Sequence, residues 1–183
     1  MTSDSHPEPE IPVDLTIDSS ILVKALVHPR RRKKDVTYKR QLALHQKALE
    51  IFECIIRKER MMFIPSVVLV EVAAVISRIT NNKENAIEAV DKIRKHSHRI
   101  LSDSEILEES ITIATETKAS GFDNIILACA ELTESALITD NSRLHEIAKG
   151  RGIKSYLLKE LIDPEITPYG LAEDKEYSYE DID

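Results

Sequence analysis

The amino-acid sequence predicts an α/β fold, a three-layer α/β/α sandwich with a central parallel sheet. Short, almost wholly apolar runs alternate along the chain with longer segments in which apolar residues recur every three or four positions. The first pattern is typical of buried strands, and the second of helices that cover a sheet. Strands that alternate with helices form parallel sheets with helices on both faces. A chain of 183 residues, 42% of them hydrophobic, is long enough for the core of one such domain.

In the first half of the chain, prolines delimit two of the predicted helices. The first helix ends at His28 and Pro29, because a residue that precedes proline disfavours helical backbone. Pro65 stands where a helix can begin, because its missing N–H group costs nothing there. The predicted elements of this half are a strand over residues 13–18, a helix over residues 19–26, a helix over about residues 42–56, a strand over residues 61–64, a helix from residues 65–66 onward and a helix over about residues 83–96.

In the second half, polar residues and glycines mark the predicted helix ends. Ser102 and Glu105 have the spacing of a capping box at a helix start. Gly121 is predicted to mark the end of that helix, Asp123 to head the next one and Gly150 to close the last one. The predicted elements of this half are a strand over residues 99–101, a helix to about residue 118, a helix over about residues 123–132, a strand over residues 136–139, a helix over residues 142–149 and a strand over residues 153–157.

Changes of composition at both ends predict the domain boundaries. Residues 1–12 carry three prolines and predict a disordered leader, whereas residues 159–183 predict an acidic tail beyond a domain over residues 13–158. The sequence contains no apolar run of membrane-spanning length and no signal-peptide pattern. Cys54 and Cys129 lack the spacing of metal ligands and are interpreted as buried thiols. We therefore expect a cytoplasmic protein without a membrane segment.

The charge of the chain is unevenly distributed. The net charge is −7, but the two ends hold 12 of the 32 acidic residues and only two of the 25 lysines and arginines. The part between them is therefore slightly basic. Five consecutive cationic residues could contact the phosphates of a nucleic acid, although such a run is also common in solvated loops. These candidate nucleic-acid-binding residues are Arg30, Arg31, Arg32, Lys33 and Lys34.

Four acidic residues are placed where a carboxylate is costly. Asp18 and Asp140 follow predicted strands, Asp123 precedes an apolar helix, and Glu71 is the only polar residue in the run 67–76. Carboxylates from several elements without an obvious set of arginines suggest a hard divalent cation. Singly, the aspartates could instead cap helices or form an Asx-turn, and Glu71 could form a salt bridge.

Together these segments resemble the PIN domain family, represented by VapC-type toxins and related small prokaryotic ribonucleases. The resemblance covers about residues 13–158. Its motifs lie at residues 17–23, 64–73, 123–130, 137–144 and 150–153. Three acids, Asp18, Glu71 and Asp123, match the family pattern without adjustment.

The resemblance implies metal-dependent hydrolysis of phosphodiester bonds in single-stranded RNA, with Mg²⁺ or Mn²⁺ as the cofactor. Asp18 and Asp123 are expected to be the principal metal ligands, and Glu71 a further ligand or the group that orients the attacking water. Ser20 and Thr139 are expected to donate hydrogen bonds nearby.

The chain departs from the family pattern in the last acidic motif. The family usually has threonine, any residue, then aspartate, whereas this chain has Thr139, Asp140 and Asn141. Two alternatives follow. Asp140 replaces the usual acid as a catalytic and metal-binding residue, or Asn141 contributes a neutral oxygen to a weaker metal site.

The resemblance also implies partners and a second candidate function. A toxin of this kind would pair with a small antitoxin protein, and we expect a homodimer or a higher homo-oligomer. The alternative is a catalytically weak or inactive module of the same fold that binds RNA or a protein. A rival class is disfavoured by one residue. Phosphatases of the haloacid-dehalogenase type need a second acid two residues after the first, and in this chain the residue two positions after Asp18 is Ser20.

Overall fold

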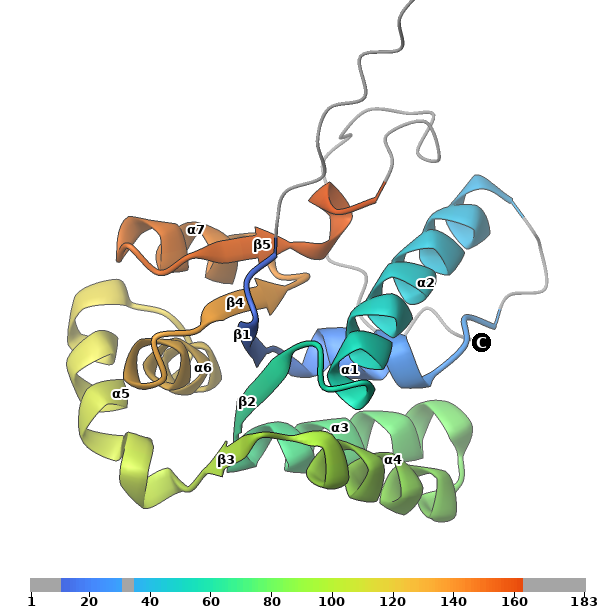
Figure 1. The fold of residues 1–183 in the computed structure, drawn as a ribbon, viewed down its shortest axis with the longest axis horizontal. Helices are drawn as coiled ribbons and strands as arrows, with labels where there is room; N and C mark the ends of the chain where they lie inside the picture. Colours follow the sequence, from blue (N-terminus) through green and yellow to red (C-terminus); the bar gives the residue numbers. More distant parts are fainter. Residues whose placement is uncertain (1–10, 31–34, 163–183) are drawn as a thin grey trace, which may run out of the picture.

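The computed structural model describes residues 11–30 and 35–162, and it confirms the three-layer α/β/α architecture (Figure 1). Its centre is a five-stranded sheet in the order β3-β2-β1-β4-β5, in which every neighbouring pair is parallel. The strands are β1 (Asp14–Ile17), β2 (Met61–Pro65), β3 (Arg99–Leu101), β4 (Ala136–Thr139) and β5 (Ser155–Leu157).

Seven α-helices and one short 3₁₀ helix surround this sheet within the described residues. They are α1 (Ser19–Leu26), α2 (Val36–Ile56), α3 (Ser66–Thr80), α4 (Lys83–His96), α5 (Asp103–Thr117), α6 (Gly121–Leu132), α7 (Ser142–Gly150) and η1 (Leu158–Glu160). Each strand and helix corresponds to a predicted element or continues one, because the apolar patterns from which they were predicted are long and regular.

The differences from prediction lie at helix ends. Helix α2 begins at Val36, about six residues before the predicted start, because the Asp35 side chain caps it by accepting a hydrogen bond from the Tyr38 N–H. Helix α5 ends at Thr117, within one residue of the predicted end, but its C-cap is Lys118, which adopts the left-handed conformation with φ of +55°, and not Gly121. Asp123 does not cap α6 either, since Ser120 is the N-cap and accepts a hydrogen bond from the Asp123 N–H.

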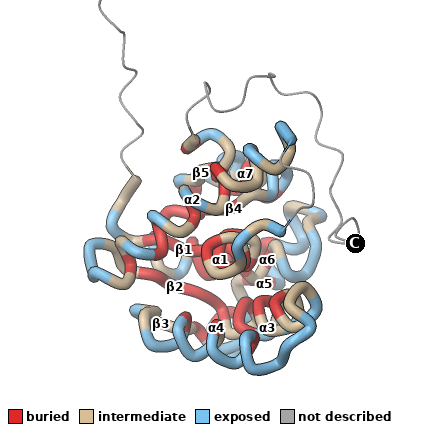
Figure 2. The backbone as a smooth tube through the Cα atoms, turned by 90° about the vertical axis from the view of Figure 1, so that its right-hand side faces the viewer, coloured by how far each residue is buried: buried red, intermediate tan, exposed pale blue. Residues whose placement is uncertain are grey.

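The core lies on both faces of the sheet, whose inner strands contribute completely buried side chains. Leu15 and Ile17 of β1 and Met62 and Ile64 of β2 are all at most 1% exposed. Figure 2 shows buried backbone running through these strands and into the helices packed beside them. Helix α6 contacts β1, β2 and β4, so the helix that carries Asp123 rests directly on the centre of the sheet.

At both ends of the described chain, residues beyond the predicted domain boundaries are also packed. Arg60 donates hydrogen bonds from Nη1 to the carbonyl oxygens of Ile11 and Pro12. Leu161 is buried against the core, three residues past the predicted end at 158. The predicted leader up to residue 10 and the tail from residue 163 lie outside the described residues.

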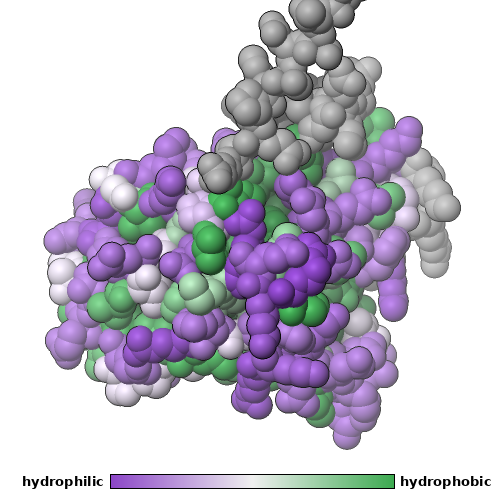
Figure 3. Space-filling model, viewed as in Figure 1, coloured by the Kyte–Doolittle hydropathy of each residue, from purple (hydrophilic) through white to green (hydrophobic). Residues whose placement is uncertain are grey.

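The described helices were compared with the length and apolarity that a bilayer requires. None of them is both long enough and apolar enough to cross a membrane. The face of the molecule in Figure 3 is mainly hydrophilic, with small hydrophobic areas between the charged side chains.

Candidate active site

Asp18 lies directly after β1, at the carboxyl edge of the sheet, and is 6% exposed. Its carboxylate accepts hydrogen bonds from three hydroxyl groups: Ser19 Oγ at 3.2 Å, Ser20 Oγ at 2.8 Å and Thr139 Oγ1 at 2.7 Å. Asp18 occupies the N-cap position of α1, but its side chain makes no capping hydrogen bond. The carboxylate is thus held in place by hydroxyl donors from two strand ends and is not used to cap the helix.

Glu71 lies in the second turn of α3 and is partly buried without a cationic partner among the described residues. Burial raises the pKa of the Glu71 carboxyl above its ordinary value, and the negative charges of Asp18 and Asp123 raise it further. A hydrogen bond with Ser19 acts in the opposite direction. No salt bridge of the described residues therefore explains Glu71, and its strongest charged neighbours are two other acids.

Asp123 lies in the first turn of α6, where its backbone N–H donates to Ser120 Oγ at 3.1 Å. The cap is supplied by Ser120, so the Asp123 carboxylate is left free of that role. The position also suits an acid, because the partial positive charge at a helix N-terminus stabilises a carboxylate in the first turn.

These three acids line one cavity of about 180 Å³. They come from three separate parts of the chain, and the cavity opens at the edge where the parallel strands end. The remaining walls combine small polar and apolar side chains. The described residues that line the cavity are Asp18, Ser19, Ser20, Val23, Glu71, Val75, Phe122, Asp123, Ile126 and Asn141.

Asn141, and not Asp140, is the residue of the last acidic motif that lines the cavity. The Asp140 carboxylate forms an ion pair with Lys24 Nζ at 2.9 Å. Asn141 is the N-cap of α7, where its Oδ1 accepts hydrogen bonds from the N–H groups of Arg143 at 3.0 Å and Leu144 at 3.1 Å. Both lone pairs of Oδ1 are then occupied, which leaves the Nδ2 amide group as the donor available to a ligand.

The donor set fits a hydrated hard cation better than a closed protein cage. In the part of the chain that the structure describes, no three His, Cys, Asp or Glu side chains converge closely enough to hold a metal ion by themselves. Mg²⁺ commonly retains several waters and binds through one or two carboxylates together with substrate phosphates. Burial is the main cause of the raised pKa of Glu71, and the repulsion from Asp18 and Asp123 that adds to it is the condition that a cation would relieve.

Five residues that line the cavity are not among the site residues predicted from the sequence: Ser19, Val23, Val75, Phe122 and Ile126. Ser19 follows Asp18 and Phe122 precedes Asp123, so for these two adjacency to a predicted acid was the available signal. Of the predicted nucleic-acid-binding residues, Arg30 is exposed, and residues 31–34 lie outside the described residues.

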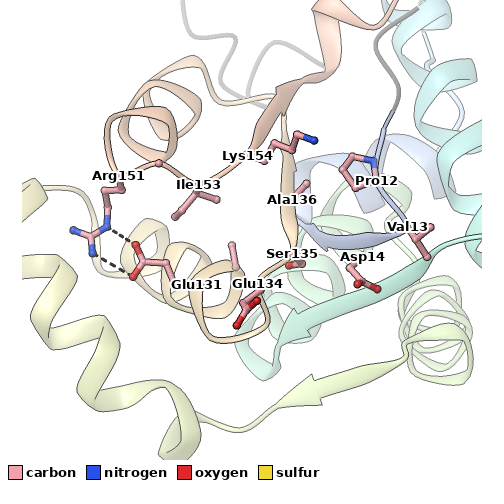
Figure 4. A pocket seen from close by; sticks show the side chains of 12 residues that line it. Pro12, Val13, Asp14, Glu131, Glu134, Ser135, Ala136, Arg151, Ile153 and Lys154 are labelled. Atoms are coloured by element: carbon pink, nitrogen blue, oxygen red, sulfur yellow. Dashed lines mark hydrogen bonds and ion pairs between the residues drawn. The ribbon is translucent and has the colours of Figure 1, made fainter.

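A second hollow of about 570 Å³ lies at the opposite edge of the sheet, beside the first residues of β1 and β4 (Figure 4). It contains none of the predicted site residues. One wall is formed by Arg151, which donates from Nε to Glu131 Oε1 at 2.7 Å, and the Oδ1 atom of Asp14 is buried there without a hydrogen-bond partner. These features describe the packing of the amino-terminal edge and do not add to the acidic cavity.

Comparisons with known proteins identify the family of the chain. The sequence profile of the PIN domain matches residues 15–150, and the chain therefore belongs to the PIN domain family, a family of nucleases. No curated protein matches the chain in a direct sequence comparison.

Two solved structures share the fold. VapBC2 from Rickettsia felis, bound to a DNA fragment from its promoter, is 18% identical with a TM-score of 0.57, and the match covers 79% of this chain and 98% of that chain. PAE2754 from Pyrobaculum aerophilum is 16% identical with a TM-score of 0.52, and the match covers 86% of this chain and 91% of that chain. At these identities the likeness concerns the fold.

Proposed function

We propose that this PIN domain is a Mg²⁺- or Mn²⁺-dependent endoribonuclease that hydrolyses phosphodiester bonds in single-stranded RNA. The observation that carries the proposal is the position of Glu71. Its carboxyl is partly buried, has no cationic partner among the described residues and has a pKa raised by burial and by Asp18 and Asp123. A site that concentrates negative charge in this way favours a divalent cation and, through it, a phosphate.

Each residue of the cavity then has a distinct task. A divalent metal ion bound there supplies an activated water and stabilises negative charge on the leaving oxygen. Asp18 and Asp123 bind the metal, and Ser20 and Thr139 keep the Asp18 carboxylate in one orientation. Glu71 binds the metal or orients the attacking water.

The last acidic motif contributes through Asn141. Its Oδ1 already caps α7, so the amide Nδ2 group is suited to donate a hydrogen bond to a phosphate oxygen. Asp140 would add a fourth carboxylate only if its ion pair with Lys24 opened. This arrangement predicts weaker binding of a second metal ion than a fourth carboxylate would give.

The RNA backbone is held, in this proposal, by Arg30, Arg31, Arg32, Lys33 and Lys34. The run follows α1, the helix that begins directly after Asp18, so it is connected to the carboxyl edge of the sheet by one short helix. Cationic side chains there would offset the repulsion between the acidic cavity and a polyanion. Replacing Arg30, Arg31 and Arg32 with alanine should weaken RNA binding and flatten its dependence on salt.

We also propose protein partners of the kind suggested by the VapBC2 structure, a small antitoxin and a second copy of this chain. A second candidate function has two observations in its favour. Asn141 lines the cavity where the family usually has an aspartate, and no closed set of metal ligands exists among the described residues. Both features favour a catalytically weak module of the same fold that binds RNA or a protein.

Cleavage of end-labelled single-stranded RNAs separates the two functions. We expect cutting with Mn²⁺ or Mg²⁺, none with EDTA, and a loss of at least about 100-fold in Asp123→Asn, because several kcal/mol of transition-state stabilisation depend on the metal. Asp91→Asn, the same change at an exposed site on α4, should cut like the wild type. Metal-independent RNA binding without cutting would instead support the binding module.

A further inference from the structure

Phe122 is the one aromatic side chain among the described residues that line the acidic cavity, and it is 53% exposed. A large apolar ring of this kind is normally turned into the core, as the 1% exposure of Phe52 illustrates. At the acidic cavity, the exposed ring of Phe122 offers a surface on which an apolar face of a ligand could lie.

The local structure fixes this ring close to the site. Phe122 lies between Gly121 and Asp123 in the first turn of α6, and the Ser120 hydroxyl secures that turn by accepting a hydrogen bond from the Asp123 N–H at 3.1 Å. Successive helical residues point about 100° apart, so the acid and the ring share one turn but face different directions. Val75 and Ile126 line the same cavity and extend the apolar side of the wall.

We propose that Phe122 is a stacking platform for an unpaired base beside the scissile phosphate, and that it makes the site selective for single strands. The inference rests on the proposed nuclease function. In a single strand a base can leave its neighbours and lay one face on an aromatic ring, whereas in a duplex both faces are covered by adjacent base pairs. Stacking is also uncharged, so it attracts a nucleotide to a cavity whose carboxylates repel its phosphate.

A single tryptophan can report this contact directly. The chain contains no tryptophan, so Phe122→Trp places one fluorophore at the cavity. The measurement is made in the Asp18→Asn background with Mg²⁺, so that RNA is bound and not consumed. Leu132→Trp is the matched control, because Leu132 is 47% exposed at the other end of the same helix and does not line the cavity.

We expect a single-stranded RNA decamer to quench the fluorescence of Phe122→Trp with the dissociation constant that anisotropy of the labelled RNA gives. The same RNA in a duplex should quench it weakly, and the Leu132→Trp signal should not change. In the otherwise unchanged enzyme, Phe122→Ala and Phe122→Leu should each raise KM by about 10-fold or more and leave kcat nearly constant, whereas Phe122→Trp should retain the wild-type KM.

The outcomes distinguish this inference from the function on which it rests. Binding seen by anisotropy without quenching, or an unchanged KM in Phe122→Ala, overturns the platform and leaves the nuclease intact. Equal quenching by duplex and single strand overturns the selectivity. Absence of both cleavage and RNA binding in the wild type removes the nuclease and the platform together. Because Phe122 is exposed, its variants should melt close to the wild type, which thermal denaturation checks.

Discussion

Lys24 Nζ contacts the Asp140 carboxylate at 2.9 Å. The ion pair joins α1, the helix after β1, to the turn after β4. The pair holds Asp140 away from the acidic cavity, whose lining at that turn is Asn141. Although the last motif contains Asp140, the cavity therefore presents three carboxylates and the amide of Asn141 to a ligand. The charge of the site is set by which of two neighbouring side chains the turn directs inward.

Restoring a carboxylate at position 141 should strengthen metal binding. In Asn141→Asp, aspartate caps α7 as well as asparagine does, so the fold should be retained while the cavity gains a negative charge. We expect the half-saturating Mn²⁺ concentration to fall by about 10-fold, in line with the 10- to 100-fold effects of residues around metal sites. Isothermal titration calorimetry measures this. Asn82→Asp is the control, because Asn82 caps α4 in the same manner outside the cavity; equal affinities in the two variants would contradict the prediction.

Removing the charge of Glu71 should stabilise the metal-free protein near neutral pH. The pKa of Glu71 is higher in the folded than in the unfolded chain, so the folded state binds more protons in the window above the ordinary glutamate pKa. Stability contributed by this group therefore falls as pH rises through that window. In EDTA, Glu71→Gln should melt above the wild type at neutral pH, with the gap closing below the ordinary glutamate pKa.

Thermal melts of Glu71→Gln, the wild type and Glu88→Gln from acidic to neutral pH measure this difference. Glu88 is an exposed residue of α4 and serves as the matched control. A Glu71→Gln variant that is less stable than the wild type at neutral pH would show that the carboxylate has a stabilising partner.

Metal binding should raise the melting temperature. A ligand at 100 times its Kd stabilises the native state by about 2.7 kcal/mol, which corresponds to roughly 5–10 °C in a chain of this size. We expect this rise with Mn²⁺ in the wild type and a much smaller one in Asp18→Asn, which lacks a principal ligand. Differential scanning fluorimetry with and without Mn²⁺ tests it, and an equal rise in both proteins would place the metal elsewhere.

Arg151, at the amino-terminal edge of the sheet, should contribute to the stability of the folded protein. This residue donates to Glu131 and also contacts Glu116, so it connects the turn after α7 to α6 and α5 (Figure 4). Arg151→Met should destabilise the protein by about 1–3 kcal/mol, the usual cost of leaving charged hydrogen-bonding groups without a partner. Urea unfolding measures this. Lys149→Met, which removes an exposed pair with Glu146, should change stability by less than about 0.5 kcal/mol.

The strands were predictable to within one or two residues, because each contains apolar residues and lies between polar segments. The residue that caps α6 could not be predicted, because serine and aspartate are both preferred caps. Only the backbone geometry shows that Ser120, and not Asp123, is the N-cap. The end of α5 was predicted to within one residue, but the residue that terminates it was not. Lys118 adopts the left-handed conformation for which glycine is the usual signal, and a glycine lies three residues further on.

The grouping of Asp18, Glu71 and Asp123 was implied by the resemblance to the PIN domain family, and all three line one cavity. Which of Asp140 and Asn141 lines the cavity could not be predicted from the sequence. It depends on Lys24, which is distant in sequence and reaches the turn only in the folded structure. A local pattern contains no information on such a contact, so the sequence alone left both alternatives open.

The central position of β1 in the sheet affects how the protein can fold while it is being synthesised. Residues 14–17 are synthesised before every other strand, but their second neighbour in the sheet begins only at residue 136. Asp123 and Asn141 are likewise synthesised late, so an emerging chain carries Asp18 and Glu71 long before the cavity can close. Domains fold as units once their elements have emerged. The acidic cavity can therefore assemble only after the chain has been synthesised as far as Asn141.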